Sequence, residues 1–430
     1  MRIAIIGTGF VGVVSAAVYA SFGHQVMGLD IDEKKIELLK KGQVPFYEPD
    51  LEDLLLKQQA KGHLHFTTSY EKAISDAQLV IIAVGTPSAP DETADLRYVM
   101  ASAESLAPYL ADQAIVAIKS TVPPGTTDKV AEIIRSQHTG QFYMASLPEF
   151  LREGSAVHDT LHPDRIVIGA DDPFVFDKLS QLHQVFKAPI VTCKIASAQM
   201  AKYTANAYLA TRITFINQIA DLCEKNGADI EEVIEAIGHD QRIGQHYWYP
   251  GLGYGGSCFP KDVKELAAYS RTIGEEGNLL NKINEINQQR IFDLLTDFAN
   301  KVDGFAGKQV AVLGLSFKAN TDDMREAPAT KIIPYLISQG AQIKSYDPMA
   351  NYQEFMGDNP TGHQQMASID AACQDADVIL LVVEWPEIVN FNYQSVRVAA
   401  KTQTIFDCRN QLDPEVIKQA GFQYVGIGRS

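Results

Sequence analysis

Short apolar runs that end at glycine or proline recur along the chain and alternate with segments of helical spacing. RIAIIG at 2–7 predicts a buried strand, and FVGVVSAAVYASFG at 10–23 predicts a helix that ends at glycine. HQVMGLD at 24–30, LVIIAV at 79–84 and AIVAIK at 114–119 predict further strands. Buried strands that alternate with helices are typical of a parallel sheet covered on both faces.

The same pattern returns late in the chain. KQVAVLG at 308–314 matches the first run, SQGAQIKSYDP at 338–348 matches the second strand, and DADVILLVVEW at 375–385 matches the third. Between the two copies, 196–227 has helical spacing without proline or internal glycine, which predicts one long helix. The fold class is therefore α/β, with two Rossmann-like doubly wound parallel-sheet domains joined by a central helical domain. The predicted domains are 1–195, 196–300 and 301–430.

Charge and cysteine usage narrow the class of protein. The 430 residues carry 53 acidic and 37 basic side chains, a net charge of −16, which disfavours nucleic acid and anionic membranes as partners. A small anionic substrate remains possible, because local cations can dominate within a pocket. The five cysteines are scattered, unlike a disulfide framework or a zinc site. We expect reduced thiols, no metal and a reducing compartment.

The N-terminal apolar stretch is not read as a secretory signal. Residues 1–20 have an early arginine and a small-residue end, but three glycines interrupt the apolar run. The other long apolar runs are far shorter than the roughly 20 residues that a membrane helix needs. We therefore expect a soluble, cytoplasmic protein.

GTGFVG at 7–12 is a candidate dinucleotide site, because it follows a strand and opens a helix. Gly7 suits the tight turn, Gly9 lets a pyrophosphate approach, and Gly12 permits close packing of helix and strand. Asp30 ends the second strand, where a carboxylate would bind both ribose hydroxyls. A 2′-phosphate would be repelled there, so NAD is favoured over NADP. The alternative is a glycine turn that binds no ligand.

The second copy reads GLSFKAN at 314–320 and lacks the other two glycines. We therefore expect no second dinucleotide. Lys318 and Arg325 instead form the kind of cationic pair that binds phosphate or sugar groups. The alternative is that both are solvated surface charges.

Cys258 lies within GLGYGGSCFPKD at 251–262 and is the candidate nucleophile. Pro260 suits a first helical turn, so the thiol precedes a helix N-terminus, and Lys261 is adjacent; both favour the thiolate. Gly255 and Gly256 leave room for a ligand near the sulfur. A small buried cysteine is the equal alternative here. Packing is the favoured interpretation for the other four cysteines, which are Cys193, Cys223, Cys373 and Cys408.

An NAD site and a reactive thiol together indicate a specific chemistry. Hydride removal turns an alcohol into an aldehyde, which a thiolate can trap; a second hydride transfer gives a thioester, and water releases an acid. The route needs a base and an activator of water. Lys202 and Asn206 lie four apart on the long helix and so share a face. The other candidates are Glu149, Glu153, Asp262 and Thr121. Several of these residues have an alternative without a catalytic role. Lys202 could be a surface lysine whose charged end reaches solvent, and the two glutamates could be solvated carboxylates. Asp262 could simply stabilise the helix dipole.

With these features together, the chain resembles the UDP-glucose/GDP-mannose dehydrogenase family over nearly its whole length. GGSCFPKD is the most specific of the motifs that carry the resemblance. The others are GTGFVG, EPDL at 48–51, VGTPS at 84–88, STVPPGT at 120–126, PEFLREGSA at 148–156, the 202–224 helix segment and FKANTDDMREAP at 317–328.

The resemblance implies two NAD-dependent oxidations of UDP-glucose at C6 and one hydrolysis, which yield UDP-glucuronate. It implies that Cys258 carries the thioester, that Lys202 and Asn206 stabilise an oxyanion, and that Asp262, Glu153, Thr121 and Glu149 form the acid/base set. The implied NAD contacts are Gly7, Gly9, Val11, Gly12, Asp30, Lys35, Thr86, Thr121, Glu153, Lys261 and Arg325. The implied substrate contacts are Glu149, Phe150, Leu151, Lys202, Asn206, Tyr249, Gly253, Gly255 and Lys318. A homodimer formed through the long helix is implied as well.

Three residues depart from the family pattern: Leu147, Asp50 and Leu252 stand where Asn, Gly and Pro are frequent. None touches the implied chemistry. Phe259 and the long helix resemble the UDP-glucose branch. A sister enzyme acting on GDP-mannose or UDP-N-acetylmannosamine is the nearest alternative. A non-catalytic protein that senses NAD and nucleotides is the other, although both the thiol and the lysine are present.

Overall fold

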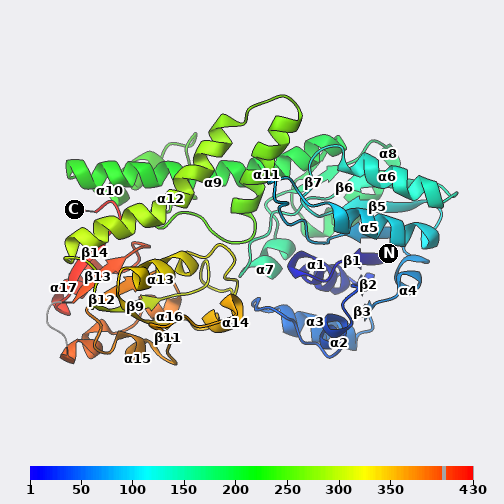
Figure 1. Cartoon of the computed structure of the whole chain (residues 1–430). Helices are drawn as coiled ribbons and strands as arrows, with labels where there is room; N and C mark the ends of the chain where they lie inside the picture. Colours follow the sequence, from blue (N-terminus) through cyan, green and yellow to red (C-terminus); the bar gives the residue numbers. More distant parts are fainter. Residues whose placement is uncertain (400–402, 430) are drawn as a thin grey trace. The chain divides into compact units, whose positions relative to one another are not determined.

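The computed structural model describes residues 1–399 and 403–429 (Figure 1). The chain forms two compact units. The first comprises Met1–Ala205 and Lys264–Glu276, and the second comprises Asn206–Val263 and Gly277–Ser430. The predicted division into three domains stays a prediction.

The first unit contains an eight-stranded sheet in the order β3-β2-β1-β4-β5-β6-β7-β8. Its strands are β1 (Arg2–Ile6), β2 (Gln25–Leu29), β3 (Leu64–Thr67), β4 (Leu79–Ile82), β5 (Ala114–Ile118), β6 (Phe142–Ser146), β7 (Ile166–Gly169) and β8 (Ile190–Cys193). Strand β1 pairs in parallel with both β2 and β4. The order of strands therefore reverses at β1, where α/β sheets bind their ligands.

The first sheet departs from a purely parallel arrangement at one place. Strands β6 and β7 pair antiparallel through Ser146 and Gly169, while β7 and β8 are parallel to each other. The connection from β6 to β7 contains only the short helix α7 (Ala156–Leu161). An antiparallel neighbour needs no long crossover, and an apolar run does not encode strand direction.

Helices cover both faces of this sheet. Residues of β1 alternate between two apolar cores: Ile3 and Ile5 pack on one side, and Ala4 and Ile6 on the other. The alternation confirms the predicted doubly covered sheet. The helices wholly within the first unit are α1 (Phe10–Ser21), α2 (Glu33–Lys40), α3 (Leu51–Ala60), α4 (Tyr70–Ile74), α5 (Arg97–Leu106), α6 (Thr126–Gln137), α7 and α8 (Pro173–His183).

The second unit contains a six-stranded parallel sheet in the order β11-β10-β9-β12-β13-β14. Its strands are β9 (Gln309–Leu313), β10 (Gln342–Tyr346), β11 (His363–Gln365), β12 (Val378–Leu381), β13 (Thr404–Asp407) and β14 (Gln423–Gly426). Its helices are α10 (Ile230–Gly238), α12 (Asn278–Lys301), α13 (Ala329–Ser338), α14 (Tyr352–Met356), α15 (Ile369–Cys373), α16 (Pro386–Val389) and α17 (Pro414–Gln419). The first six strands of the other unit have the same order, so the predicted repeat of two Rossmann-like sheets is confirmed.

Two helices run from one unit into the other. The long helix α9 (Ile195–Asn226) matches the predicted range to within one residue at each end, and α11 (Phe259–Thr272) begins directly after Cys258. Within the residues that the structure describes, no helix combines the length and the apolar character needed to cross a bilayer.

The glycine turn after β1 is packed too closely to accept side chains at two of its positions. Gly7 has φ of +95°, and a Cβ there would lie 2.6 Å from the carbonyl oxygen of Ala83. A Cβ on Gly12 would overlap the carbonyl oxygen of Gly7. Gly9, in contrast, has no atom within 4 Å of its Cβ position.

We predict that Gly12→Ala destabilises the protein by about 3 kcal/mol, because the added methyl group must push helix α1 away from the turn. Gly9→Ala is the matched control: its φ of −75° suits any residue, and its cost should stay below about 1 kcal/mol. Thermal unfolding of the two variants measures the difference. Equal melting temperatures would contradict the packing argument.

Candidate active site

The turn between β1 and α1 has the shape that a dinucleotide requires. Gly9 opens onto free space at the N-terminus of α1, where backbone N–H groups favour a phosphate. Asp30 follows β2, and its Oδ2 accepts hydrogen bonds from the Thr8 amide at 2.8 Å and from the Thr8 hydroxyl at 2.9 Å. These observations fit the predicted NAD site.

Asp30 is held as a carboxylate. Burial raises its pKa, but hydrogen bonds from the Thr8 and Asp32 backbones and the charge of Lys35 outweigh burial and lower the pKa overall. Lys35 Nζ lies 3.3 Å from Oδ2 of Asp30. An ionised carboxylate is an acceptor only, which suits the two hydroxyls of a ribose. Lys35 thus pairs with Asp30, and its predicted contact with NAD stays a prediction.

The loops after β4 and β5 are joined at the same edge of the sheet. The hydroxyl of Thr86, which is buried, donates to the carbonyl oxygen of Thr121 at 2.9 Å. Val11 lies in the first turn of α1 and is partly exposed. Parallel strands bring their carboxyl ends to one edge, so Thr86 and Thr121 lie in loops that follow the neighbouring strands β4 and β5.

Lys202 has the partner that its position in an apolar helix requires. Its Nζ lies 2.8 Å from Oε1 of Glu149, and both side chains are more than nine-tenths buried. Glu149 Oε2 also accepts a hydrogen bond from the Leu151 amide at 2.9 Å. Phe150 lies alongside, with its ring centre 5.7 Å from the ammonium group. The structure therefore brings together four predicted residues of the first unit in one buried ion pair and its surroundings.

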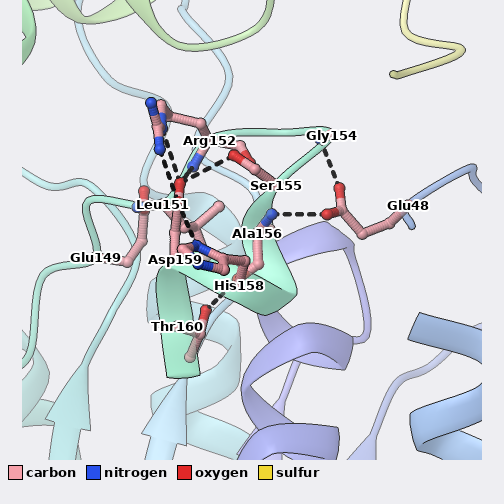
Figure 2. A network of polar contacts seen from close by, with 10 residues as sticks. All are labelled: Glu48, Glu149, Leu151, Arg152, Gly154, Ser155, Ala156, His158, Asp159 and Thr160. Atoms are coloured by element: carbon pink, nitrogen blue, oxygen red, sulfur yellow. Dashed lines mark hydrogen bonds and ion pairs between the residues drawn. The ribbon is translucent and has the colours of Figure 1, made fainter. Parts of the chain in front are cut away.

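Glu153 lies in the same loop, four residues after Glu149, and is 9% exposed. The residue before it, Arg152, donates to the Asp159 carboxylate from its backbone amide at 3.0 Å and from its guanidinium at 2.8 and 2.9 Å (Figure 2). The residue after it, Gly154, donates to Glu48 at 2.6 Å. The backbone on both sides of Glu153 is therefore fixed by side chains.

Lys119 is a residue near this pair that sequence reasoning missed. It follows β5, and burial lowers the pKa of its ammonium group to about 8, with Glu149 opposing the shift and the charge of Lys202 adding to it. The lysine of the AIVAIK run could have been noticed, because a cation at the end of a buried strand needs a partner.

Cys258 is exposed, whereas the other four cysteines are buried or partly buried. Burial raises the pKa of Cys193 and Cys223, and it raises the pKa of Cys373 to about 12. Burial likewise raises the pKa of Cys408. Cys258 directly precedes α11, as predicted, and the interpretation of this residue as a buried packing cysteine is wrong.

The first turn of α11 holds a buried carboxylate beside this thiol. Asp262 is 1% exposed; its Oδ2 accepts from Asn206 Nδ2 at 2.6 Å, and Lys261 Nζ lies 2.7 Å from Oδ1. The amide of Asp262 donates to the carbonyl oxygen of Cys258 at 2.8 Å. Four predicted site residues therefore form one cluster within the second unit.

The glycine loop before Cys258 packs against the segment that carries the predicted cations. The Gly256 amide donates to the carbonyl oxygen of Arg325 at 3.1 Å, and a Cβ on Gly255 would collide with the carbonyl oxygen of Glu326. Lys318 lies in the same segment, with its Nζ 5.5 Å from the Phe317 ring centre. Arg325 pairs with Asp323 at 2.7 Å, a partner that the sequence prediction did not include.

Side chains of helices α9 and α12 fix the start of this loop through hydrogen bonds. The Asn217 side chain accepts from the Gly251 amide at 2.7 Å, and Asn287 accepts from the Tyr254 amide at 2.8 Å and donates to its carbonyl oxygen at 2.9 Å. Tyr249 remains exposed, and Gly253 has φ of +90°. The local sequence could not reveal the two asparagines, because they come from distant helices.

Known proteins are similar to this chain over its whole length. The NAD binding domain of the UDP-glucose/GDP-mannose dehydrogenase family matches residues 1–187, its central domain 196–289, and its UDP binding domain 311–414. The UDP-glucose 6-dehydrogenase YwqF of Bacillus subtilis is 41% identical over 433 residues, covering 100% of this chain and 98% of that protein.

Two solved structures are similar over the full chain. A UDP-glucose dehydrogenase from Pyrobaculum islandicum has 35% identity and a TM-score of 0.92, with 100% of this chain and 98% of that chain covered. A UDP-D-ManNAc dehydrogenase from Pyrococcus horikoshii has 28% identity and a TM-score of 0.87, with 100% and 99% covered.

We predict that the effect of Lys119→Met on stability depends on pH. Lys119 has a folded pKa of about 8 against 10.5 for a free lysine, so between these values the unfolded chain binds a proton that the folded chain lacks. Raising the pH through this window therefore stabilises the wild type. Lys119→Met, which removes the buried charge, should melt above the wild type at pH 7, and the gap should narrow above pH 8 and close once the pH passes about 10.5. A gap independent of pH would contradict this assignment.

Proposed function

Because the chain belongs to the UDP-glucose/GDP-mannose dehydrogenase family, we propose that it oxidises UDP-glucose to UDP-glucuronate. The chain is an NAD-dependent nucleotide-sugar dehydrogenase with an NAD-binding domain and a UDP-binding domain. The observation that carries the proposal is the exposed thiol of Cys258 at the start of α11, next to the buried Asp262 cluster.

In the first oxidation, C6 of the sugar loses a hydride and its hydroxyl group loses a proton. NAD, when bound, accepts the hydride in each of the two oxidations. The proton passes through a water molecule to Asp262, whose orientation Asn206 and Lys261 fix. Lys202 and Asn206 stabilise negative charge on the sugar oxygen as it develops.

Cys258 then retains the aldehyde. Its thiolate bonds to C6 and the aldehyde oxygen takes a proton, which gives a thiohemiacetal. Loss of a second hydride from C6 and of the hydroxyl proton gives a thioester. A water molecule attacks the thioester carbon and gives up a proton; the C–S bond breaks and returns the thiolate. We assign this water to Glu153 and Thr121, and we place Glu149 in the same acid/base set.

The binding assignments extend the same proposal. The NAD contacts would be Gly7, Gly9, Val11, Gly12, Asp30, Lys35, Thr86, Thr121, Glu153, Lys261 and Arg325. The sugar nucleotide would contact Glu149, Phe150, Leu151, Lys202, Asn206, Tyr249, Gly253, Gly255 and Lys318. Arg325 is the least direct of these assignments, because Asp323 already neutralises its charge.

We also propose a homodimer that uses α9. Three large apolar side chains recur every seven residues along this helix and are about half exposed: Tyr208 at 58%, Phe215 at 49% and Leu222 at 57%. Residues seven apart lie on one side of a helix, so these side chains form a continuous apolar stripe. A stripe of this kind is typical of a helix that packs against a second copy. The predicted cytoplasmic location stays a prediction.

A sister substrate is the alternative, because the Pyrococcus horikoshii structure of similar fold is that of a UDP-D-ManNAc dehydrogenase. We predict that the full-length enzyme forms two NADH per UDP-glucose consumed. NADH absorbance and loss of the sugar nucleotide, measured together, give this ratio. GDP-mannose and UDP-N-acetylmannosamine serve as parallel substrates. A ratio of one would exclude the thioester route, and faster turnover of another sugar would change the substrate.

We predict that Cys258→Ser abolishes steady-state turnover. The serine hydroxyl is a poorer nucleophile than the thiolate, and an ester at that position is released to water more slowly than a thioester. Cys193→Ser is the control, because that thiol lies in β8 and its pKa is raised by burial. NADH formation with UDP-glucose measures both variants. Full activity in Cys258→Ser would remove the covalent step.

A further inference from the structure

The Glu48 carboxylate makes a bidentate contact with the loop that carries Glu149 and Glu153. Its Oε2 accepts from the Gly154 amide and its Oε1 from the Ala156 amide, both at 2.6 Å (Figure 2). Glu48 is 6% exposed and lies more than one hundred residues earlier in the chain. Hydrogen bonds between a carboxylate and backbone amides are short and strong, and two of them fix both position and orientation.

The contact replaces a missing helix cap. Ser155 occupies the N-cap position of α7, yet its side chain makes no capping bond to the helix amides. Its hydroxyl instead donates to the Asp159 carboxylate at 3.2 Å. The amide of Ala156, in the first turn, is satisfied by Glu48, so the direction in which the loop enters α7 depends on a residue from another segment.

Glu153 lies between two such fixed points. Arg152 is tied to Asp159 on one side, and Gly154 is tied to Glu48 on the other. Glu149 is held separately, by Lys202 and by the Leu151 amide. Loss of the Glu48 contact should therefore move Glu153 while leaving the Glu149–Lys202 pair in place.

We propose that Glu48 is a positioning residue that holds Glu153 in place for the hydrolysis of the thioester. This inference rests on the proposed function, because it assigns Glu153 to the attacking water. In that step the water oxygen bonds to the thioester carbon, its proton passes to the base, and the C–S bond breaks with its electron pair on sulfur. Nothing in the contact requires Glu48 to touch substrate.

The test compares three variants of the full-length enzyme. Glu48→Gln keeps the shape of the side chain and one acceptor, but its NH₂ group faces one of the two amides. Glu48→Ala removes the contact. Glu52→Gln is the matched control, because Glu52 is exposed and accepts from the Val44 amide, outside the Glu153 loop. If Glu48→Ala does not fold, Glu48→Gln still decides the question.

Three measurements are made on each variant. Hydrogen exchange of the 150–160 peptide should become faster in Glu48→Gln and stay unchanged in Glu52→Gln. The kcat of Glu48→Gln should fall about ten- to a hundredfold, and KM for the sugar nucleotide should fall with it, because the slowed hydrolysis follows the oxidations. The fraction of enzyme found as acyl-enzyme by acid quench and intact mass should rise, because hydrolysis is slowed more than the oxidations.

Each measurement has an outcome that overturns the inference. Unchanged exchange at 150–160 in Glu48→Gln would show that Glu48 does not hold the loop. A fall in kcat without a rise in acyl-enzyme, or an equal fall in Glu52→Gln, would make Glu48 a structural residue only. The kinetic arms use whichever of the three sugar nucleotides yields NADH with the wild type. If UDP-glucose yields no NADH, the substrate proposal is wrong. The hydrogen-exchange measurement does not depend on the substrate, so it tests the role of Glu48 independently.

Discussion

The buried carboxylate of Asp262 is the constraint on which the arrangement of the second unit depends. A carboxylate that is 1% exposed costs several kcal/mol unless charged or polar partners satisfy it. Asn206 from α9 and Lys261 from the first turn of α11 supply those partners. Because the amide of Asp262 also closes the turn that begins at the carbonyl of Cys258, the same group fixes where the thiol leaves the glycine loop.

The first unit also contains a buried charged group with polar partners, but here the group is a cation. Lys202 is the buried cation, Glu149 is its partner, and the Leu151 amide satisfies the second carboxylate oxygen. Lys202 and Asn206 are one turn apart on α9, so one continuous helix presents both buried polar groups. Removing one partner of such a pair leaves an uncompensated charge in the interior, which is strongly destabilising.

Much of the architecture was predictable because local sequence patterns determine it. Apolar runs predicted strands of both sheets, the absence of breakers predicted α9, and Pro260 with Lys261 predicted the helix after Cys258. Long-range partners were not predictable. The spacing of Lys202 and Asn206 predicted that they share a helix face, but the pairing of Lys202 with Glu149 required the fold. Glu48 carries no local sign that it reaches Gly154, and the antiparallel pairing of β6 with β7 leaves no trace in hydrophobic periodicity.

The two Rossmann-like sheets also show how one topology supports different sites. Gly7 and Gly314 both have positive φ and both pack against the neighbouring strand end, at Ala83 and Val383. After Gly7 the chain enters helix α1 almost at once, which provides a helix N-terminus for a phosphate.

After Gly314 no α-helix begins until α13, and the amides of Leu315 and Ser316 donate to Asp347 at 2.7 and 3.1 Å. The second copy therefore has no helix dipole at this turn, and its positive charge must come from side chains such as Lys318. Side-chain cations can be placed along a longer, more varied ligand than a single helix end can serve. The two sheets have the same strand order but different turns after their first strands. This difference in the turn is sufficient for the two sheets to support different kinds of binding site.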